Sequence, residues 1–177
     1  MKASAFDAVL DVPLPRGVRE VRAEAVFLWA NANARTVDYA FAGRHDAPFV
    51  RVEISPPMDV RWGDPFELRS GGSSLGRGTC LFPDPASPDE IKPARRKALL
   101  ARLALGEKDM LLALAEAGGL EGLQGERLAS FSRLSASRVE TLARALEADG
   151  RLRILAFDPQ RLVAEVSLDF LRGRIAA

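Results

Sequence analysis

The hydrophobic pattern changes its period near the middle of the chain, and this change constrains the fold more than any other feature. In residues 5–82, short runs alternate apolar and charged side chains, as half-buried strands do. In residues 92–175, apolar side chains recur every three or four positions, as on one face of a helix. Residues 83–90 contain three prolines and no large apolar side chain, which excludes a helix or a central strand. The sequence therefore predicts two domains.

The first part predicts an antiparallel β-domain. Short β-rich runs separated by turn residues indicate strands at residues 5–12, 21–29, 35–41, 49–54, 65–69 and 78–82. Six short strands of this kind are typical of a small barrel or sandwich, and we favour a small antiparallel β-barrel covering residues 1–86.

The second part predicts a linker with a basic helix at residues 87–105, followed by a helical domain at residues 106–177. Ser135 is the expected N-cap of a central helix. The order helix, helix, turn, helix and two short strands is the plan of a winged helix-turn-helix. The predicted fold class is therefore α+β, with a β-barrel followed by a winged helix.

Side chains suited to catalysis or metal binding are scarce. The chain has no Gly-x-x-x-x-Gly-Lys-Ser/Thr phosphate loop, and its glycine-rich residues 71–78 lack both the lysine and a following helix. A single cysteine, Cys80, and a single histidine, His45, provide no zinc motif and no disulfide. We expect Cys80 to be a buried thiol and His45 a solvated turn residue. The sequence thus predicts a protein that is not an enzyme and has no cofactor.

Charge and hydropathy restrict the partners and the compartment. The net charge of +1 is small for a dedicated nucleic-acid-binding domain, so any such role must depend on local patches. The N-terminus lacks a signal-peptide pattern, and no apolar stretch approaches the ~20 residues that span a membrane. We expect a cytoplasmic monomer without a membrane partner.

Three segments resemble a known family. Residues 50–57 read Val-Arg-Val-Glu-Ile-Ser-Pro-Pro, residues 62–69 read Trp-Gly-Asp-Pro-Phe-Glu-Leu-Arg, and residues 75–83 read Leu-Gly-Arg-Gly-Thr-Cys-Leu-Phe-Pro. This pattern is similar to the end of the third domain of elongation factor Tu-like translation factors, above all to selenocysteine-specific elongation factors. In those factors the barrel continues into tandem winged helices. The resemblance covers nearly the whole chain.

The resemblance implies a non-catalytic portion of such a factor, acting in selenocysteine incorporation. GTP and magnesium would belong to a GTPase region that this chain lacks. The implied partners are selenocysteyl-tRNA, the ribosome and a messenger-RNA hairpin, reached through the full-length factor. Two departures weaken the match: Arg77 stands where the family has glycine or alanine, and Ser70 replaces an acidic residue.

The resemblance also suggests residues that contact RNA. The family's equivalent loop lies on the tRNA backbone, which makes Arg69, Ser74, Gly76 and Arg77 candidate contacts; the alternative is that the two arginines are solvated strand-end charges. Glycines let backbone amides approach phosphates, and arginines supply charge.

Two further basic groups are candidates. Arg95, Arg96 and Lys97 would contact a phosphate backbone; the alternative is a solvated helix face whose leucines pack on the barrel. Arg133 and Arg138 would contact RNA from the winged helix, although two arginines against two glutamates on its third helix favour a structural spacer.

Two other functions remain open. One is a transcriptional regulator, in which the winged helix binds operator DNA and the β-barrel acts as a sensor or dimerisation domain. The other is an interaction scaffold. Salt-dependent binding to tRNA, to the messenger-RNA hairpin and to duplex DNA would separate the three.

Overall fold

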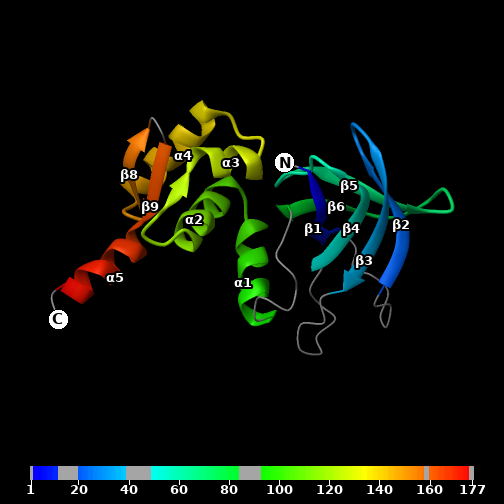
Figure 1. Ribbon diagram of the computed structural model, residues 1–177, viewed down its shortest axis with the longest axis horizontal. Helices are drawn as coiled ribbons and strands as arrows, with labels where there is room; N and C mark the ends of the chain where they lie inside the picture. Colours follow the sequence, from blue (N-terminus) through cyan, green and yellow to red (C-terminus); the bar gives the residue numbers. More distant parts are fainter. Residues whose placement is uncertain (1, 12–19, 39–48, 84–92, 158–159, 176–177) are drawn as a thin grey trace. The chain divides into compact units, whose positions relative to one another are not determined.

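The chain forms two compact units, each of which is described by itself. The computed structural model describes residues 2–11, 20–38, 49–83, 93–157 and 160–175, and its units are Met1–Ala101 and Arg102–Ala177. The first unit is a β-barrel with a helix, and the second combines helices with a small sheet (Figure 1). The predicted α+β class is confirmed. The predicted domain boundary at residue 86 lies outside the described residues.

The described part of the first unit contains a closed antiparallel barrel of six strands. Around the barrel the strand order is β1-β4-β3-β2-β5-β6, and β6 pairs with β1 to close it. Strand β1 lies beside β4 rather than β2, which is a Greek-key arrangement. The strands are β1 (Ala3–Leu10), β2 (Glu20–Phe27), β3 (Asn31–Asp38), β4 (Phe49–Met58), β5 (Pro65–Ser70) and β6 (Ser73–Pro83).

The alternation seen in the sequence places one side of each strand in the barrel core. On β1, Phe6, Ala8 and Leu10 are buried in one cluster with apolar residues of the other strands. The rings of Phe6, Phe27 and Phe66 meet in the middle of this cluster, with centroids 5.1 to 5.9 Å apart. Burial of these rings supplies much of the hydrophobic stabilisation of the unit.

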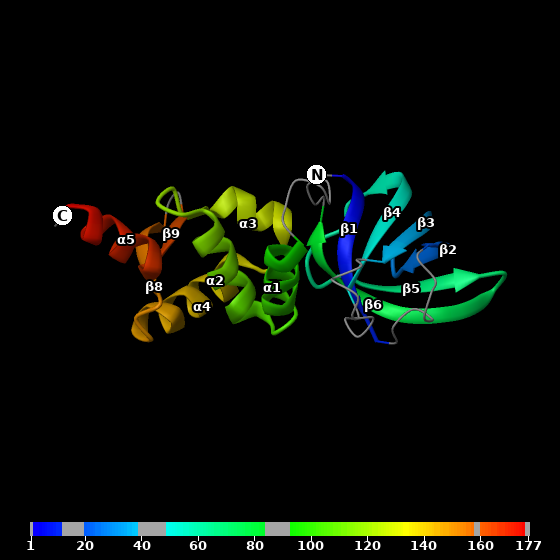
Figure 2. The same cartoon turned by 90° about the horizontal axis from the view of Figure 1, so that it is seen from below.

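Strands β5 and β6 form a long hairpin that extends beyond the other strands (Figure 2). The strands predicted at residues 65–69 and 78–82 would leave a loop of residues 70–77 between them. The structure reduces that loop to two residues, because Gly71 and Gly72 both have positive φ, at 58° and 83°. Two such residues form a turn that matches the twist of paired strands, so pairing continues to the tip.

Gly78 on β6 is held close to its neighbours. A Cβ atom at this position would lie 2.7 Å from the carbonyl oxygen of Val9 and 2.7 Å from the ring of Phe66. We therefore expect Gly78→Ala to lower the free energy of unfolding by about 1–3 kcal/mol through overpacking. Thermal unfolding followed by circular dichroism measures this, with Ser73→Ala, an exposed position on the same strand, as the control. Equal midpoints for the two variants would contradict the expectation.

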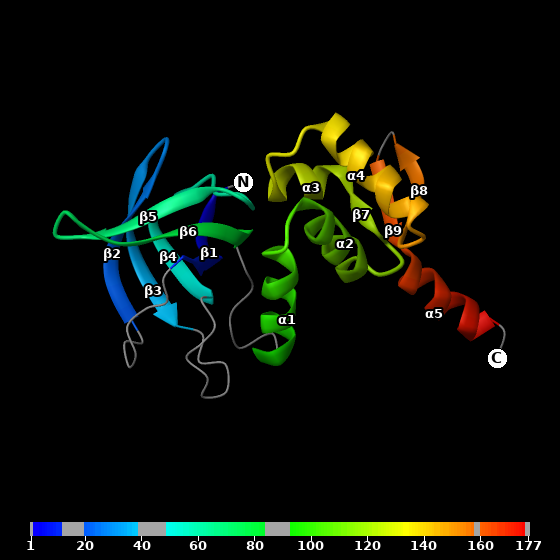
Figure 3. The ribbon, with the colours of Figure 1, turned by 180° about the vertical axis from the view of Figure 1, so that it is seen from behind.

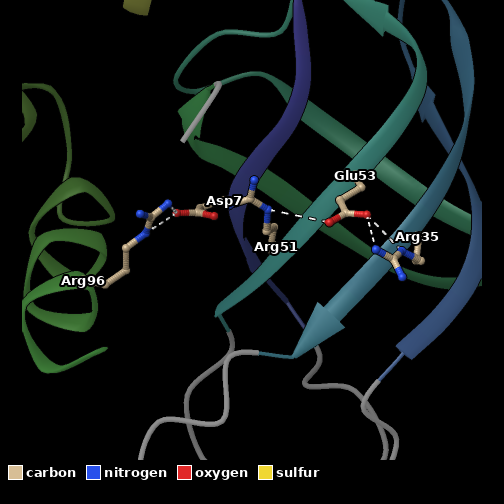
Figure 4. A network of polar contacts seen from close by, with 5 residues as sticks. All are labelled: Asp7, Arg35, Arg51, Glu53 and Arg96. Atoms are coloured by element: carbon tan, nitrogen blue, oxygen red, sulfur yellow. Dashed lines mark hydrogen bonds and ion pairs between the residues drawn. The ribbon is translucent and has the colours of Figure 1, made fainter. Parts of the chain in front are cut away.

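Helix α1 (Pro93–Leu103) is linked to the barrel by a buried ion pair. The Arg96 guanidinium donates to the Asp7 carboxylate on β1, with N–O distances of 2.5 and 2.7 Å (Figure 4). Asp7 is 0% exposed and Arg96 is 3% exposed. The guanidinium carbon also lies 5.8 Å from the centroid of the Phe82 ring. These contacts fix one face of α1 against the outer side of β1.

The second unit consists of helices around a small sheet (Figure 3). Its sheet has the order β7-β9-β8, and the fully buried side chains of Met110, Leu111, Leu146 and Leu162 belong to its core. In chain order its elements are α2 (Glu107–Ala117), β7 (Leu123–Gln124), α3 (Gly125–Phe131), α4 (Ala136–Ala148), β8 (Leu152–Phe157), β9 (Gln160–Ala164) and α5 (Glu165–Ile175).

Two details of this unit can be compared with the predictions made from the sequence. The predicted N-cap is confirmed, since the Ser135 hydroxyl accepts a hydrogen bond of 3.2 Å from the Arg138 amide. Strand β7 was not predicted. It has only two residues, too few to show an alternating pattern, and it exists because it pairs with β9.

Candidate nucleic-acid interface

The β5–β6 hairpin carries four of the residues predicted to contact RNA. Arg69 lies opposite Ser74, and Arg77 lies opposite Glu67. Gly76 lies next to an irregularity in the pairing, where the register shifts between Leu68 and Arg69. The hairpin therefore brings Arg69, Ser74, Gly76 and Arg77 together, on paired strands rather than on a flexible loop.

Glu67 occupies the centre of this group. Its carboxylate accepts from Arg69 Nε at 2.7 Å. The pKa of Glu67 is lowered from its ordinary value, first by the Ser74 hydroxyl and then by Arg69 and Arg77. Glu67 thus stays ionised at neutral pH and offsets part of the positive charge that the two arginines present.

The basic residues of α1 do not form one surface, which corrects part of the prediction. Arg95 is exposed and Lys97 is half-buried, whereas Arg96 is buried against Asp7. A guanidinium enclosed in this way and bonded to a carboxylate is not accessible to a phosphate in solution. Arg96 is therefore removed from the candidate RNA contacts and assigned to the packing of α1.

Both predicted RNA contacts of the second unit are exposed. Arg133 lies in the connection between α3 and α4. Arg138 on α4 forms an ion pair of 2.5 Å with Glu107 on α2. Further along α4, Arg144 pairs with Glu140 at 2.8 Å. The α4 arginines are thus engaged with glutamates of their own unit, which reduces the positive potential of this helix.

A group of arginines on the outer face of the barrel was not among the predicted sites. An open hollow of about 700 Å³ lies over this face and is lined by β1, β2, β3 and β4. Its basic lining residues are Arg22, Arg35 and Arg51. Arg35 donates to Glu53 from Nε and Nη2, at 2.9 and 2.5 Å, and Arg51 Nε lies 3.9 Å from the other Glu53 oxygen (Figure 4).

Arg22 and Arg35 lie directly opposite each other on β2 and β3. Like charges at directly opposed positions destabilise a sheet, so this pair costs stability unless an anion offsets it. Arg22 is exposed and, within the described part of the chain, has no carboxylate in ion-pair contact. Glu53 pairs with Arg35 and also lies near Arg51, so one carboxylate serves two arginines. The arrangement is suited to binding an anion.

The hollow and the hairpin share one outer surface. The pairing register places Arg69 beside Glu24, the outward neighbour of Arg22 on β2. We call the outward arginines of β2 to β6 the arginine face; its members are Arg22, Arg35, Arg51, Arg69 and Arg77. Among the side chains that the structure describes on these strands, its acidic members are Glu24, Glu53 and Glu67.

The described residues were also compared with the requirements of a metal site, a reactive cysteine and a membrane-spanning helix. Within the described ranges, no group of three or more His, Cys, Asp or Glu side chains is arranged to hold a metal ion. The Cys80 thiol is buried, as predicted, and burial raises its pKa well above the ordinary value. His45 lies outside the described residues. Among the described helices, none has the length and apolar character needed to cross a bilayer.

Comparison with known proteins adds a likeness of fold. No protein-family model matches the chain, and no curated protein matches it. Among solved structures, it is similar to the bacterial selenocysteine-specific elongation factor EF-Sec, with 16% sequence identity and a TM-score of 0.48. The match covers 93% of this chain and 34% of that chain, so this chain spans about a third of the factor. The function therefore has to be argued from the chain's own residues.

Proposed function

We propose that this chain is a non-catalytic, RNA-binding portion of a translation factor of the selenocysteine-specific elongation factor type. The observation that carries the proposal is the arginine face, with Arg22 and Arg35 opposed across β2 and β3 beside an open hollow. Phosphate groups of an RNA backbone would neutralise this charge, and guanidinium groups bind phosphates with two parallel hydrogen bonds.

The sequence resemblance supports the choice of family. The segments that resemble the factors, residues 50–57 and 62–83, form parts of β4, β5 and β6, next to the arginines of the face. The proposal assigns no chemical step to this chain, and GTP and magnesium would act in a GTPase region elsewhere in the factor. Selenocysteyl-tRNA is the RNA that the family implies, with the ribosome and the messenger-RNA hairpin as partners of the whole factor.

For the second unit we infer a winged helix that acts as a spacer. Its elements follow the order helix, strand, helix, helix and two strands, in which α4 would be the recognition helix. Because Arg138 and Arg144 on α4 pair with Glu107 and Glu140, this helix offers little charge to a phosphate-lined groove. The same pairs disfavour the alternative of a DNA-binding regulator.

Salt-dependent binding of tRNA, compared with duplex DNA of similar size, tests the proposal. The double variant Arg22→Gln/Arg35→Gln is expected to weaken tRNA binding at low salt by about ten-fold or more, because two charge-assisted contacts are lost. The slope of log K against log salt should become shallower by about 2, one for each phosphate contact.

The matched control is Arg138→Gln/Arg144→Gln on α4, which removes the same charge from exposed positions of the second unit. We expect this control to leave tRNA binding unchanged. If it weakens binding of duplex DNA while the barrel variant has no effect on tRNA, the regulator is the better description. If neither nucleic acid binds at low salt, the RNA-binding proposal is wrong.

A further inference from the structure

The tip of the β2–β3 hairpin carries two large apolar side chains that are exposed to solvent. Leu28 is 89% exposed and Trp29 is 45% exposed. Single exposed apolar residues are ordinary on a protein surface. A tryptophan beside a leucine at a strand turn exposes more apolar area to water than a single residue does. At such positions aromatic rings commonly contact a ligand.

The Trp29 ring is held in place from the barrel side. It stacks on Phe27, with a centroid distance of 5.4 Å and an interplanar angle of 30°. Phe27 in turn meets Phe6 edge-on at 5.9 Å and lies 5.9 Å from Phe66. Because the aromatic core fixes the ring that supports it, Trp29 loses little conformational freedom when a ligand stacks on its exposed part.

The tip continues the strands that carry the arginine face. Arg22 and Arg35 lie on β2 and β3, the two strands that the tip joins. Arg77 pairs with Glu67, which pairs with Val26 on β2, so Arg77 lies two strand spacings, or about 10 Å, from β2. A short oligonucleotide bound to Arg77 by its backbone therefore reaches the tip.

We propose that Trp29 stacks on an unpaired base of the RNA whose backbone lies on the arginine face. This inference rests on the proposed function and deepens it, because it names an unpaired nucleotide as part of the ligand. Bases within a duplex are already stacked and hidden, whereas unpaired bases stack on aromatic side chains next to basic grooves. Arg77, which the pairing connects through Glu67 to Val26 near the tip, supplies a phosphate contact within reach of Trp29, and this favours a nucleotide over an apolar protein surface.

Tryptophan fluorescence provides a direct test. The chain has two tryptophans, so the variant Trp62→Phe leaves Trp29 as the only one. Three probes are titrated: an unstructured single-stranded RNA of about ten nucleotides, its duplex, and an abasic oligomer of the same length. We expect the single strand to quench Trp29 fluorescence strongly, and the abasic oligomer to bind without quenching.

Two substitutions of the same residue separate stacking from general apolar contact. Trp29→Leu is expected to weaken single-strand binding by about ten-fold, whereas Trp29→Phe keeps it within about three-fold because the aromatic face remains. Neither variant should change binding of the abasic oligomer, and circular dichroism confirms that both are folded.

The outcomes distinguish this inference from the proposed function. If single-strand binding is the same in wild type and Trp29→Leu, the tip contacts something other than a base, such as a protein, and the stacking inference is overturned while RNA binding stands. Equal quenching by the abasic oligomer overturns it as well. If none of the three probes binds the wild-type chain, the proposed function fails and the stacking inference fails with it.

Discussion

Replacing Asp7 with alanine is expected to lower the free energy of unfolding of the barrel unit by about 3–5 kcal/mol. The variant leaves Arg96 buried without its counter-ion, since Asp7 is 0% and Arg96 3% exposed and the two are joined by contacts of 2.5 and 2.7 Å. A guanidinium cannot lose its proton at ordinary pH, so the charge must stay buried or α1 must leave the barrel. Either outcome is costly.

The measurement uses the two tryptophans, Trp29 and Trp62, because both lie in the barrel unit and report on its unfolding alone. Urea denaturation followed by fluorescence gives the free energy for each variant. The matched control is Asp59→Ala, which breaks a partly exposed ion pair of 3.2 Å with Arg61 and should cost no more than about 1 kcal/mol.

A second variant shows whether the charge itself is responsible. Asp7→Leu/Arg96→Met replaces the pair with apolar side chains, and such replacements of buried ion pairs are often neutral or stabilising. We therefore expect this double variant to regain most of the stability lost in Asp7→Ala. A cost for Asp7→Ala no larger than that for Asp59→Ala would show that α1 is not fixed to β1 in solution.

The strands of the barrel could be predicted because each follows a local rule. In β4, the alternation of Val50, Val52 and Ile54 with charged residues identifies the strand and its buried side. The N-cap Ser135 followed by a helical period similarly located α4. Where a rule depends on a few neighbouring residues, the sequence was sufficient.

The arginine face could not be predicted, because it depends on register. Arg22, Arg35 and Arg51 lie on three strands, and each looks like an ordinary outward charge when its strand is considered alone. A shift of one residue in any pairing would turn such a side chain to the other side of the sheet. The register that brings Arg22 opposite Arg35 is fixed by how the whole barrel packs.

Arg96 was misassigned for the same reason. In the sequence it belongs to a basic run with Arg95 and Lys97, and a charge run is normally solvated. Its partner Asp7 is 89 residues away in the chain, and only the docking of α1 on β1 brings the two together. Asp7 gave no signal of its own, because a charged residue between Phe6 and Ala8 is what the alternation of a half-buried strand produces.

Replacing Phe27 with alanine is expected to lower the free energy of unfolding of the barrel by about 3–5 kcal/mol. Phe27 is 4% exposed and contacts Phe6, Phe66 and Trp29, so its removal opens a cavity at the centre of the aromatic cluster. Trp29→Ala removes a larger ring from the surface side of the same stack, and it should cost about 1 kcal/mol or less, because the site is open to water.

Comparing the stabilities of these two variants shows whether Trp29 contributes to the barrel core or to ligand binding. Urea denaturation gives both values, with Trp62 as the remaining fluorophore in Trp29→Ala. If Trp29→Ala costs as much as Phe27→Ala, Trp29 is part of the barrel core, and its exposure needs no ligand to explain it. If its cost is small, the stability of the fold does not account for a tryptophan at this tip, and its contribution must lie in binding.

Phe27→Leu tests whether the stacking support beneath Trp29 matters for RNA binding. Leucine fills most of the cavity but provides no stacking support for Trp29, so this variant should keep the barrel folded while it weakens quenching by single-stranded RNA.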